Sequence, residues 1–384
     1  MIIRRSYYFQ LKANASQRTQ LSRFAGCCRL VWNKGLELQK KRLDQQKRPL
    51  TYAEECAELI GWKKEIPFLQ EIHSQPLQQT LKNLDRAMKD GLSNDRGFPK
   101  FKKKGQKDSF RYPQGTKLDD DKIYLPKIGW VKFRKSREIE GTVKNVTVSK
   151  NAGKWYISIQ VEMEVPEPIH PATSAVGIDL GVTKFATLSD GTVLESINSG
   201  KKLKKKLARQ QRTLSRRTKF SANWKEQKAK IQKTHSKIAN VRNDYLHKAS
   251  SEMSKNHALI ILEDLKVRSM TKSAKGTEDA PSKNVAAKSG LNRSILDQGW
   301  YEFKRQLKYK QEWAGGMMIL VNPKHTSQTC SMCSHTAAEN RQSQSQFQCV
   351  NCGYLDNADL NAAKNILAAG RAALACGDIG RNAA

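Results

Sequence analysis

AVGIDLGVTKFATLSDG, residues 175–191, is the stretch that decides the fold of the second half of the chain. It predicts an apolar strand, a tight turn and a second strand. Asp179 lies inside the first of these strands, although Asp and Glu are rarely buried without a partner. The stretch therefore combines a core strand with a carboxylate that needs a specific environment.

The elements that follow predict an α/β domain. HALIILEDL (257–265) and MMILVNP (317–323) are short apolar strands, and residues 201–245 predict a long helical hairpin. Residues 294–316 predict one helix that stops at Gly315-Gly316. Apolar strands alternating with helices in this order indicate helices packed on a sheet.

The first half of the chain predicts a β domain with a helical insertion. Residues 2–11 form a strand pattern, and residues 12–95 have helical spacing. Strand patterns follow Gly97, and the last of them alternates Trp155, Ile157, Ile159 and Val161 on one buried face. We expect a β-barrel or a strongly curved sheet. Residues 166–172 are predicted to form the linker that follows this domain.

Two close cysteine pairs indicate a structural zinc site. Fifteen residues separate the pair Cys330 and Cys333 from the pair Cys349 and Cys352, which matches zinc-ribbon spacing. Four thiolates complete a tetrahedral shell and leave no position for water, so this zinc would not be catalytic. Four unrelated cysteines or a redox pair are the alternatives, and both fit two matched pairs poorly.

Three acids suggest a second metal site. Asp179 and Glu263 occur in or at the end of apolar strands, and Asp359 precedes a helix pattern. Clustered carboxylates are good ligands for Mg²⁺, and a two-ion site would support phosphodiester cleavage. The alternative is that such acids are caps or solvated edges, and Asp359 could simply be a helix N-cap.

The charge of the chain points to nucleic acid. Lys and Arg total 69 against 36 acids, a formal net charge of +33, which repels itself unless a polyanion neutralises it. No apolar run approaches the ~20 residues that span a bilayer, and the N-terminus lacks a signal-peptide core. We therefore expect a cytoplasmic protein with no membrane partner.

Two basic stretches and one glutamine stripe are candidate nucleic-acid contacts. Residues 201–219 carry ten basic residues and no acid, a one-sidedness that favours phosphate binding over an ordinary solvated face. Residues 98–112 mix lysines with Phe98, Phe101, Phe110 and Tyr112, which suits RNA stacking or, equally, core packing. The basic candidates are Lys102, Lys103, Lys104, Lys204, Lys205, Arg209, Arg212 and Arg216. The glutamine stripe consists of Gln75, Gln78 and Gln79. Glutamine side chains can pair with adenine edges, but they are also typical of solvated helix surface.

These residues resemble the TnpB family, compact relatives of type V CRISPR nucleases, almost from end to end. The matching blocks include GFPKFKKK (97–104), GIDLGVTKFATLSDG (177–191), ILEDLKV (261–267), NPKHTSQTCSMC (322–333) and CVNCGYLDNADLNAAKNIL (349–367).

The resemblance implies an α/β multidomain fold. Its parts would be a β-barrel wedge domain (1–11 and 96–170), an inserted helical recognition domain (12–95), a RuvC/RNase H-like nuclease domain (171–325 and 353–384) and an inserted zinc ribbon (326–352).

The resemblance also implies the activity. The catalytic acids of a Mg²⁺-dependent endonuclease would be Asp179, Glu263 and Asp359. Two other acids close by in the sequence, Asp264 and Asp356, are the ones most easily mistaken for them. The partners would be a guide RNA from the transposon end and double-stranded target DNA, bound by a monomer that acts at the bacterial nucleoid. We find no helix-turn-helix signature, so paired RNA would select the sequence and the protein would check an adjacent motif. The rivals are a strand-transferring transposase or recombinase and a non-catalytic RNA-guided DNA-binding repressor.

Overall fold

The computed structural model describes residues 1–93, 97–274, 276 and 283–377. The chain divides into two compact units, Met1–Pro166 and Glu167–Ala384, and the division falls at the start of the linker expected at residues 166–172. The boundary expected between residues 95 and 96 lies outside the described residues, as do residues 378–384 of the expected nuclease domain.

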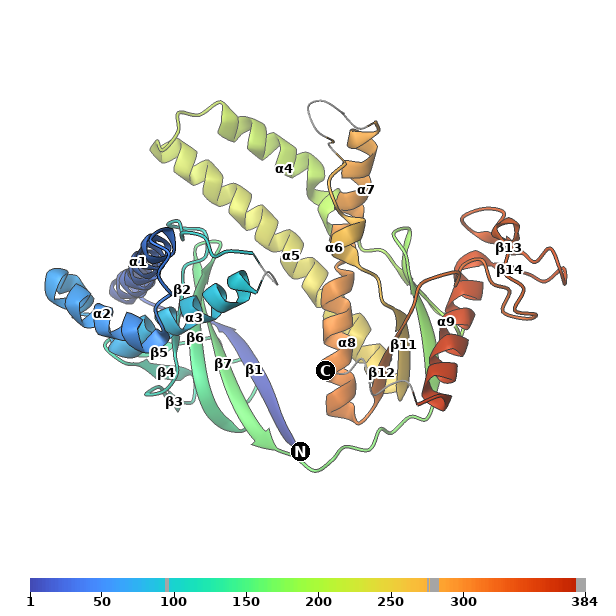
Figure 1. Ribbon diagram of the computed structural model, residues 1–384, viewed down its shortest axis with the longest axis horizontal. Coiled ribbons are helices and arrows are strands. Elements are labelled where there is room, and N and C mark those ends of the chain that lie inside the picture. The colour runs from blue at the N-terminus through green and yellow to red at the C-terminus, as the bar shows by residue number, and fades with distance from the viewer. Residues whose placement is uncertain (94–96, 275, 277–282, 378–384) are drawn as a thin grey trace. The chain divides into compact units, whose positions relative to one another are not determined.

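The first unit contains two antiparallel sheets. The larger has the order β1 (Ile2–Gln10), β7 (Lys154–Glu164), β6 (Thr142–Asn151) and β2 (Ser109–Tyr112) (Figure 1). The smaller contains β3 (Lys117–Asp119), β4 (Lys122–Leu125) and β5 (Gly129–Lys132). A bridge between Leu11 and Phe133 connects the segments that follow β1 and β5. The expected barrel thus takes the form of two bridged sheets.

The hairpin of β6 and β7 follows from its sequence. Asn151 pairs with Lys154, which leaves Ala152 and Gly153 as a two-residue loop with φ of 47° and 84°. Positive φ at both positions is the type I′ turn that matches strand twist. Trp155, Ile157, Ile159 and Val161 are all at most 3% exposed, so the predicted buried face of β7 is confirmed.

The helices of the first unit share the core of the sheets. They are α1 (Ala15–Asp44), α2 (Tyr52–Glu65), the short 3-10 helix η1 (Pro67–Leu69) and α3 (Ser74–Leu92), and capping boxes start α1 at Asn14 and α2 at Thr51. Leu21 and Val31 of α1 belong to the same buried cluster as Ile157 of β7. The helical insertion therefore packs on the β structure around one hydrophobic core.

The second unit is built on a five-stranded sheet. The strand order is β10 (Val193–Glu195), β9 (Lys184–Leu188), β8 (Ala175–Leu180), β11 (Leu259–Glu263) and β12 (Met317–Val321). β11 pairs in parallel with both β8 and β12, whereas β9 pairs antiparallel with both of its neighbours.

The helices between these strands confirm the predicted hairpin and correct one prediction. The hairpin consists of α4 (Ser199–Ser215) and α5 (Ala222–Asn256), followed by the short α6 (Val267–Met270). The single helix predicted over residues 294–316 is wrong, because Gly299, with φ of 76°, separates α7 (Val285–Gln298) from α8 (Trp300–Ala314). Gly315, with φ of 75°, ends α8 as predicted.

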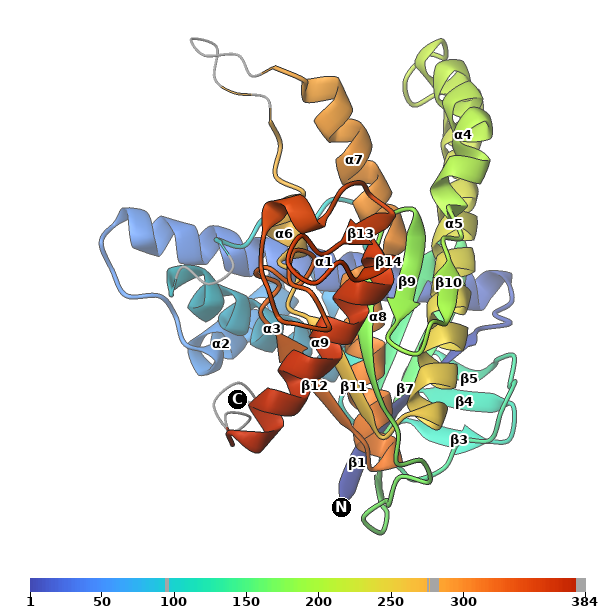
Figure 2. The same ribbon diagram turned by 90° about the vertical axis from the view of Figure 1, so that its right-hand side faces the viewer.

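Helices cover both faces of the second sheet (Figures 1 and 2). On one face, Ile178 and Leu262 pack in a cluster with Leu246 of α5 and Phe303 of α8. On the other face, Ile261 and Ile319 pack against Ile366 of α9 (Ala358–Ala375). Because side chains alternate along a strand, each strand of this sheet has one face toward α5 and α8 and the other toward α9.

Two glycines allow α9 to approach the sheet closely. A Cβ atom on Gly177 of β8 would overlap the backbone of α9, at the carbonyl oxygen of Ala363 and the amide of Leu367. A Cβ atom on Gly370 of α9 would overlap the side chain of Ile261 in β11. The position of α9 over β8 and β11 therefore depends on the absence of a methyl group at both glycines.

We expect Gly177→Ala to lower the free energy of unfolding by at least about 2 kcal/mol, because the added methyl group meets backbone that cannot rotate away. Gly290→Ala is the matched control, because nothing lies within 4 Å of the Cβ that it adds to α7. Urea unfolding of the two variants tests the prediction. A Gly177→Ala protein as stable as the parent would show that α9 does not pack here.

Candidate active site

Strand alternation places two of the predicted acids on the α9 face of the sheet. Val176 and Ile178 of β8 point into the cluster beneath α5 and α8, so Asp179 points the other way. Ile261 of β11 points toward α9, and Glu263, two residues further on, shares its face. Both carboxylates lie at the C-terminal ends of neighbouring parallel strands.

Asp359 comes to these strands from the first turn of α9. The N-cap of α9 is Asn357, whose side-chain oxygen accepts hydrogen bonds from the backbone amides of Asp359 (3.1 Å) and Leu360 (3.3 Å). The suggestion that Asp359 is itself the N-cap is therefore wrong. The Asp359 carboxylate instead forms an ion pair with Arg341 at 3.7 Å.

Glu263 and Asp359 lie close enough to Asp179 to raise its pKa. Burial, followed by repulsion from Glu263 and Asp359, raises the pKa of Asp179 from 3.8 to about 7, against an opposing effect of Arg341. Burial also raises the pKa of Glu263, although the Thr326 hydroxyl donates a 2.5 Å hydrogen bond to it. This geometry concentrates negative charge in a poorly solvated place, the condition in which a cation is bound.

The two neighbouring acids are engaged elsewhere. Asp264 accepts a 2.9 Å hydrogen bond from Lys304 of α8. Asp356 accepts hydrogen bonds from Lys364 (2.8 Å) and from the Tyr354 hydroxyl (2.7 Å). Each is neutralised by its own lysine, whereas Asp179 lies near two acids, with Arg341 and a backbone hydrogen bond of Leu180 opposing the rise of its pKa.

The four cysteines of the two pairs meet at one point. The Sγ atoms of Cys330 and Cys352 are 3.7 Å apart, those of Cys333 and Cys349 are 3.6 Å apart, and all four lie within 4.8 Å of one another. Zinc with four sulfurs at about 2.3 Å has sulfur–sulfur edges of about 3.8 Å, so the cluster fits a structural zinc ion. Across the described residues, no other group of His, Cys, Asp or Glu ligands is equally compact, so the three carboxylates are spaced more widely.

Hydrogen bonds tie the cysteine segment to α9 and the acids. The buried Asn361 side chain accepts from the Ser331 amide (3.0 Å) and donates to the Thr329 carbonyl (2.8 Å). Asn365, one turn further along α9, donates to the carbonyls of Thr326 and Thr329. Sequence reasoning missed these residues, although two asparagines four positions apart in an Ala-rich helix were an available signal.

Arg341 and Thr326 were also missed, and the sequence carries no signal for them. Arg341 lies between the two cysteine pairs and reaches Asp359. Thr326 lies 63 residues after Glu263 in the chain and contacts it only through the fold.

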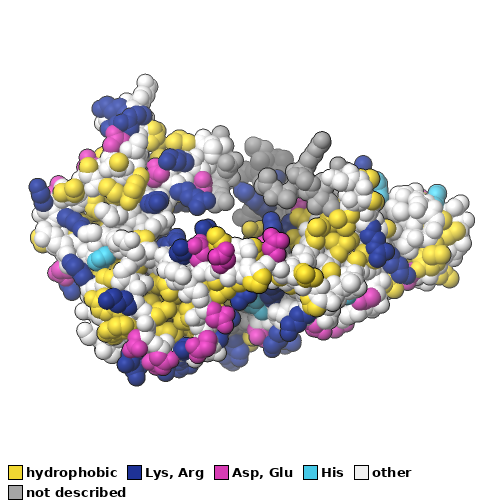
Figure 3. Space-filling view, turned by 90° about the horizontal axis from the view of Figure 1, so that it is seen from below, with side chains coloured by type: hydrophobic (Ala, Val, Ile, Leu, Met, Phe, Trp, Pro, Cys, Tyr) yellow, Lys and Arg dark blue, Asp and Glu magenta, His cyan; other side chains and the backbone are white. Residues whose placement is uncertain are grey.

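The basic candidates differ in their surroundings. Lys204, Lys205, Arg209, Arg212 and Arg216 are all exposed on or next to α4, of which only Ser199 is buried. Lys102, Lys103 and Lys104 are exposed as well, and the ammonium of Lys102 lies 3.6 Å from the centre of the Trp32 ring. Away from α4 the charge is mixed, and on the face shown in Figure 3 acidic side chains lie among the Lys and Arg side chains.

The rings near the lysines divide into two groups. Phe110 and Tyr112 are buried core residues, whereas Phe98 and Phe101 are 37% and 46% exposed. Of the two interpretations of these rings, core packing is therefore correct for Phe110 and Tyr112 only.

The three glutamines of α3 do not form a uniform exposed stripe. Gln78 is exposed, and Gln79 donates a 3.0 Å hydrogen bond to Asn83. The side-chain oxygen of Gln75 is buried and has no partner within the described part of the chain.

Comparison with known proteins identifies the family. A family model described as "Probable transposase" matches residues 158–274, and one described as "Cas12f1-like, TNB domain" matches residues 300–366. The "Putative RNA-guided DNA endonuclease InsQ" of Escherichia coli K12 is 56% identical over 97% of this chain and 94% of its own length. A "Putative RNA-guided DNA endonuclease" of Streptomyces pristinaespiralis is 33% identical over 98% of this chain and 92% of its own length. The chain belongs to the TnpB family.

Two solved structures are also similar to this TnpB-family chain. The Cas12f1–sgRNA–target DNA complex has a TM-score of 0.36 at 15% identity and covers 95% of this chain and 99% of its own. CasPhi-2 (Cas12j) bound to crRNA has a TM-score of 0.43 at 12% identity and covers 95% and 97%.

A third family model, described as "Helix-turn-helix domain", matches residues 1–48. It corrects the expectation that no such signature is present. The structure, however, has β1 and the single 30-residue helix α1 over these residues. Over the described ranges, no helix is long and apolar enough to cross a membrane.

We expect metal analysis of the purified protein to give about one zinc per chain. Cys349→Ser should lose the zinc and lower the unfolding temperature, because one vertex of the cluster disappears and the segment has little core of its own. Cys376→Ser is the control, since Cys376 is exposed and outside the cluster. Zinc retained at the parental level in Cys349→Ser would contradict the assignment.

A second prediction concerns the pH dependence of stability in magnesium-free, zinc-containing buffer. The raised pKa of Asp179 means that the folded state holds this proton more tightly than the unfolded state, so its contribution to stability is lost as pH rises toward 7. Asp179→Asn has no titrating carboxyl at this position and does not lose stability in this way. We expect the free energy of unfolding of the variant minus that of the parent to increase by about 2 kcal/mol between about pH 5.5 and pH 8. Urea unfolding that gives parallel pH profiles for the two proteins would rule out the raised pKa.

Proposed function

We propose that this protein is an RNA-guided DNA endonuclease that hydrolyses phosphodiester bonds of guide-matched double-stranded DNA next to a short protein-read motif. The proposal extends to this chain what the names of its InsQ and Streptomyces relatives state. The observation that carries it is the position of Asp179, whose pKa is raised by burial and by the nearby charges of Glu263 and Asp359, acids that come from a neighbouring strand and a helix. In a chain with a net charge of +33, a cluster of carboxylates is suited to the hydrolysis of phosphodiester bonds in nucleic acid.

The three carboxylates would hold Mg²⁺, in a two-ion site of the RuvC type. Bound ions would supply an activated water and stabilise the leaving oxygen. The donor set fits, because hard oxygen ligands suit Mg²⁺ and their own repulsion favours a cation. The Thr326 hydroxyl would fix the orientation of Glu263, and Arg341 would offset part of the negative charge beside Asp359.

The same proposal assigns the parts of the chain. Residues 171–325 and 353–384 would form the RuvC/RNase H-like domain, and residues 326–352 its zinc ribbon. Residues 1–11 and 96–170 would be the wedge domain, and residues 12–95 the recognition domain. The sheet with helices on both faces supports the nuclease assignment, whereas the wedge and recognition segments share one hydrophobic core within a single compact unit.

The exposed cations of α4, with Lys103 and Lys104, would bind phosphates of guide RNA and of the RNA–DNA duplex. In α3, Gln78 and Gln79 would contact the motif beside the target, whereas the buried oxygen of Gln75 makes this residue the weaker candidate. We propose that one protein copy suffices for these contacts.

Two other functions make different predictions. A strand-transferring transposase would use similar carboxylates, and the description "Probable transposase" favours it. It would join donor and target DNA, whereas an endonuclease leaves free ends. A non-catalytic repressor would bind guide-matched DNA without cutting it, and the presence of all three acids speaks against it.

We expect Asp179→Ala, Glu263→Ala and Asp359→Ala each to abolish cleavage while binding of RNA and DNA is retained, because the lost charge repels phosphate. Asp244→Ala, which removes an exposed carboxylate of α5, should cut like the parent. Cleavage of a guide-matched plasmid and gel-shift binding measure the two activities. Normal cutting by Asp359→Ala together with inactivity of Asp356→Ala would move the third ligand to Asp356.

Cleavage should also require the guide. Protein with transposon-end RNA and Mg²⁺ should cut only plasmids that match the guide segment, because base pairing reads the sequence. A changed guide segment should redirect the cut with the protein unchanged. Equal, sequence-specific cutting by RNA-free protein would refute the proposed function, and joined donor–target products would favour the transposase.

A further inference from the structure

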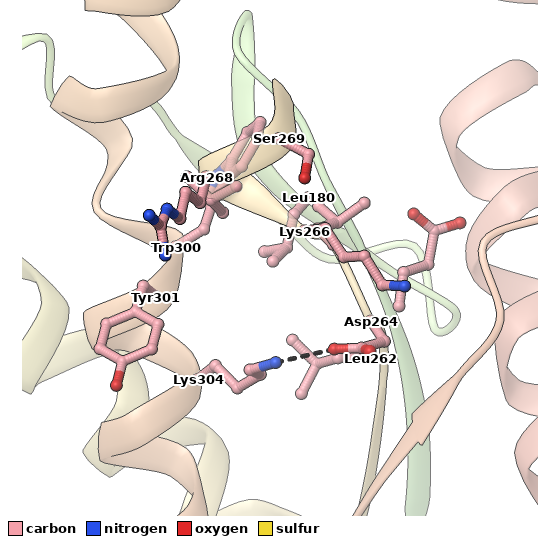
Figure 4. A pocket seen from close by; sticks show the side chains of 12 residues that line it. Leu180, Leu262, Asp264, Lys266, Arg268, Ser269, Trp300, Tyr301 and Lys304 are labelled. Atoms are coloured by element: carbon pink, nitrogen blue, oxygen red, sulfur yellow. Dashed lines mark hydrogen bonds and ion pairs between the residues drawn. The ribbon is translucent and has the colours of Figure 1, made fainter. Parts of the chain in front are cut away.

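A pocket of about 390 Å³ lies beside the candidate active site (Figure 4). It is formed by Leu180 at the end of β8, residues 262–269 at the end of β11 and beyond, and the first turns of α8. Glu263 is one of its lining residues, although Leu262 and Asp264 place the pocket on the α8 face of the sheet and the three acids lie toward α9, so a bound strand would have to cross the strand ends to reach them. The carboxyl ends of parallel strands are where open α/β sheets bind their ligands.

The charge of the pocket favours an anion. Lys266, Arg268 and Lys304 line it, and Figure 4 shows Lys304 reaching across to Asp264, which it neutralises. Neither Lys266 nor Arg268 has an ion-pair partner among the residues that the structure describes. The α8 N-terminus, at Trp300, has no side-chain cap on its free amides, which adds positive potential.

The indole of Trp300 supplies an independent sign of a ligand. Trp300 is 5% exposed and lines the pocket, yet its Nε1–H is buried with no hydrogen-bond partner. A buried donor without an acceptor is costly, so native structures rarely retain one without a reason. The nitrogen is shielded from solvent in this structure, so a ligand oxygen would accept this hydrogen bond only where binding exposes it.

The rim of the pocket carries an exposed ring. Tyr301 is 70% exposed and lines the pocket on the side of α8 (Figure 4). Aromatic rings beside cations are the combination that binds single-stranded nucleic acid, because bases stack on the ring while phosphates pair with the charges. The pocket thus offers a stacking surface, a neutral donor and unpaired cations.

We propose that this pocket binds one nucleotide of the DNA strand that enters the site of Asp179, Glu263 and Asp359. Its base stacks on Tyr301, its phosphate pairs with Arg268 and Lys266, and one of its oxygens accepts the hydrogen bond of Trp300. The assignment rests on the proposed nuclease function, because it makes the pocket a binding site for the strand being cut. A free nucleotide has the same chemistry, so the test separates the two sources.

The first test is direct binding of 5′-phosphorylated trithymidylate to the full-length chain, measured by calorimetry in about 0.3 M salt to suppress nonspecific binding. Tyr301→Ala and Trp300→Phe should each weaken binding about five- to fiftyfold, through the lost stacking and the lost hydrogen bond. Tyr301→Phe keeps the ring and should bind like the parent. Arg268→Ala should weaken binding, whereas Lys308→Ala, which removes a positive charge of α8 outside the pocket, should not.

Trp300→Phe removes the Nε1–H but also part of an indole that packs in the core, so a modest fall of the unfolding temperature is expected from packing alone. Reduced binding by a variant that stays folded at the assay temperature, together with reduced binding by Tyr301→Ala at the exposed rim, supports the proposal. Parental affinity in both Trp300→Phe and Tyr301→Ala, or absence of trithymidylate binding by the parent, overturns it.

Cleavage kinetics of the guide-RNA complex provide the second test. Tyr301→Ala should raise the KM for matched DNA at least fivefold with a smaller change in kcat, because the pocket positions the strand. If thymidine monophosphate binds as tightly as the trinucleotide and the variants cut with parental KM, the pocket takes a free nucleotide and the strand assignment is wrong. If the parent does not cut matched DNA at all, the nuclease function fails, and calorimetry still decides whether the pocket binds a nucleotide.

Discussion

The backbone of α9 rests on the backbone of β8 at Gly177, and the geometry of the candidate site depends on this contact. Because no side chain separates them, the first turn of α9 lies at the level of the strand ends. Asp359 thereby joins Asp179 and Glu263 on one face of the sheet. A wider separation of helix and sheet would leave two acids on the strands and the third out of reach.

The contact holds together groups that repel one another. Burial and the charges of the other two acids disfavour the ionised form of Asp179 in the ligand-free fold, and Arg341 beside Asp359 and the Thr326 hydroxyl on Glu263 offset part of the negative charge. Both residues come from the segment around the first cysteine pair, which Asn361 and Asn365 fasten to α9. The cysteine cluster is therefore coupled to the acids through hydrogen bonds, although its zinc would take no part in chemistry.

The strands and the meeting of the four cysteines could be predicted because each depends on local pattern. Alternation along β7 and β8 reflects the pleat, and the cysteine pairs reflect the reach of a short turn. Tertiary contacts decided the remainder. Phe110 and Tyr112 are core residues while Phe98 and Phe101 are exposed, although the same basic stretch contains all four. The break at Gly299 was missed because the apolar pattern runs on through it, and the barrel became two sheets joined at Leu11 and Phe133.

The placement of α9 also determines when the acid cluster can exist during synthesis. Asp179 is made 180 residues before Asp359 (359 minus 179), and the sheet that carries Asp179 and Glu263 is already complete at β12. A ribosome that stops anywhere between β12 and α9 releases a chain with its basic helices but only two of the three carboxylates. Such a product has the cations of α4 without the complete set of acids, so the proposed nuclease chemistry waits for the synthesis of α9.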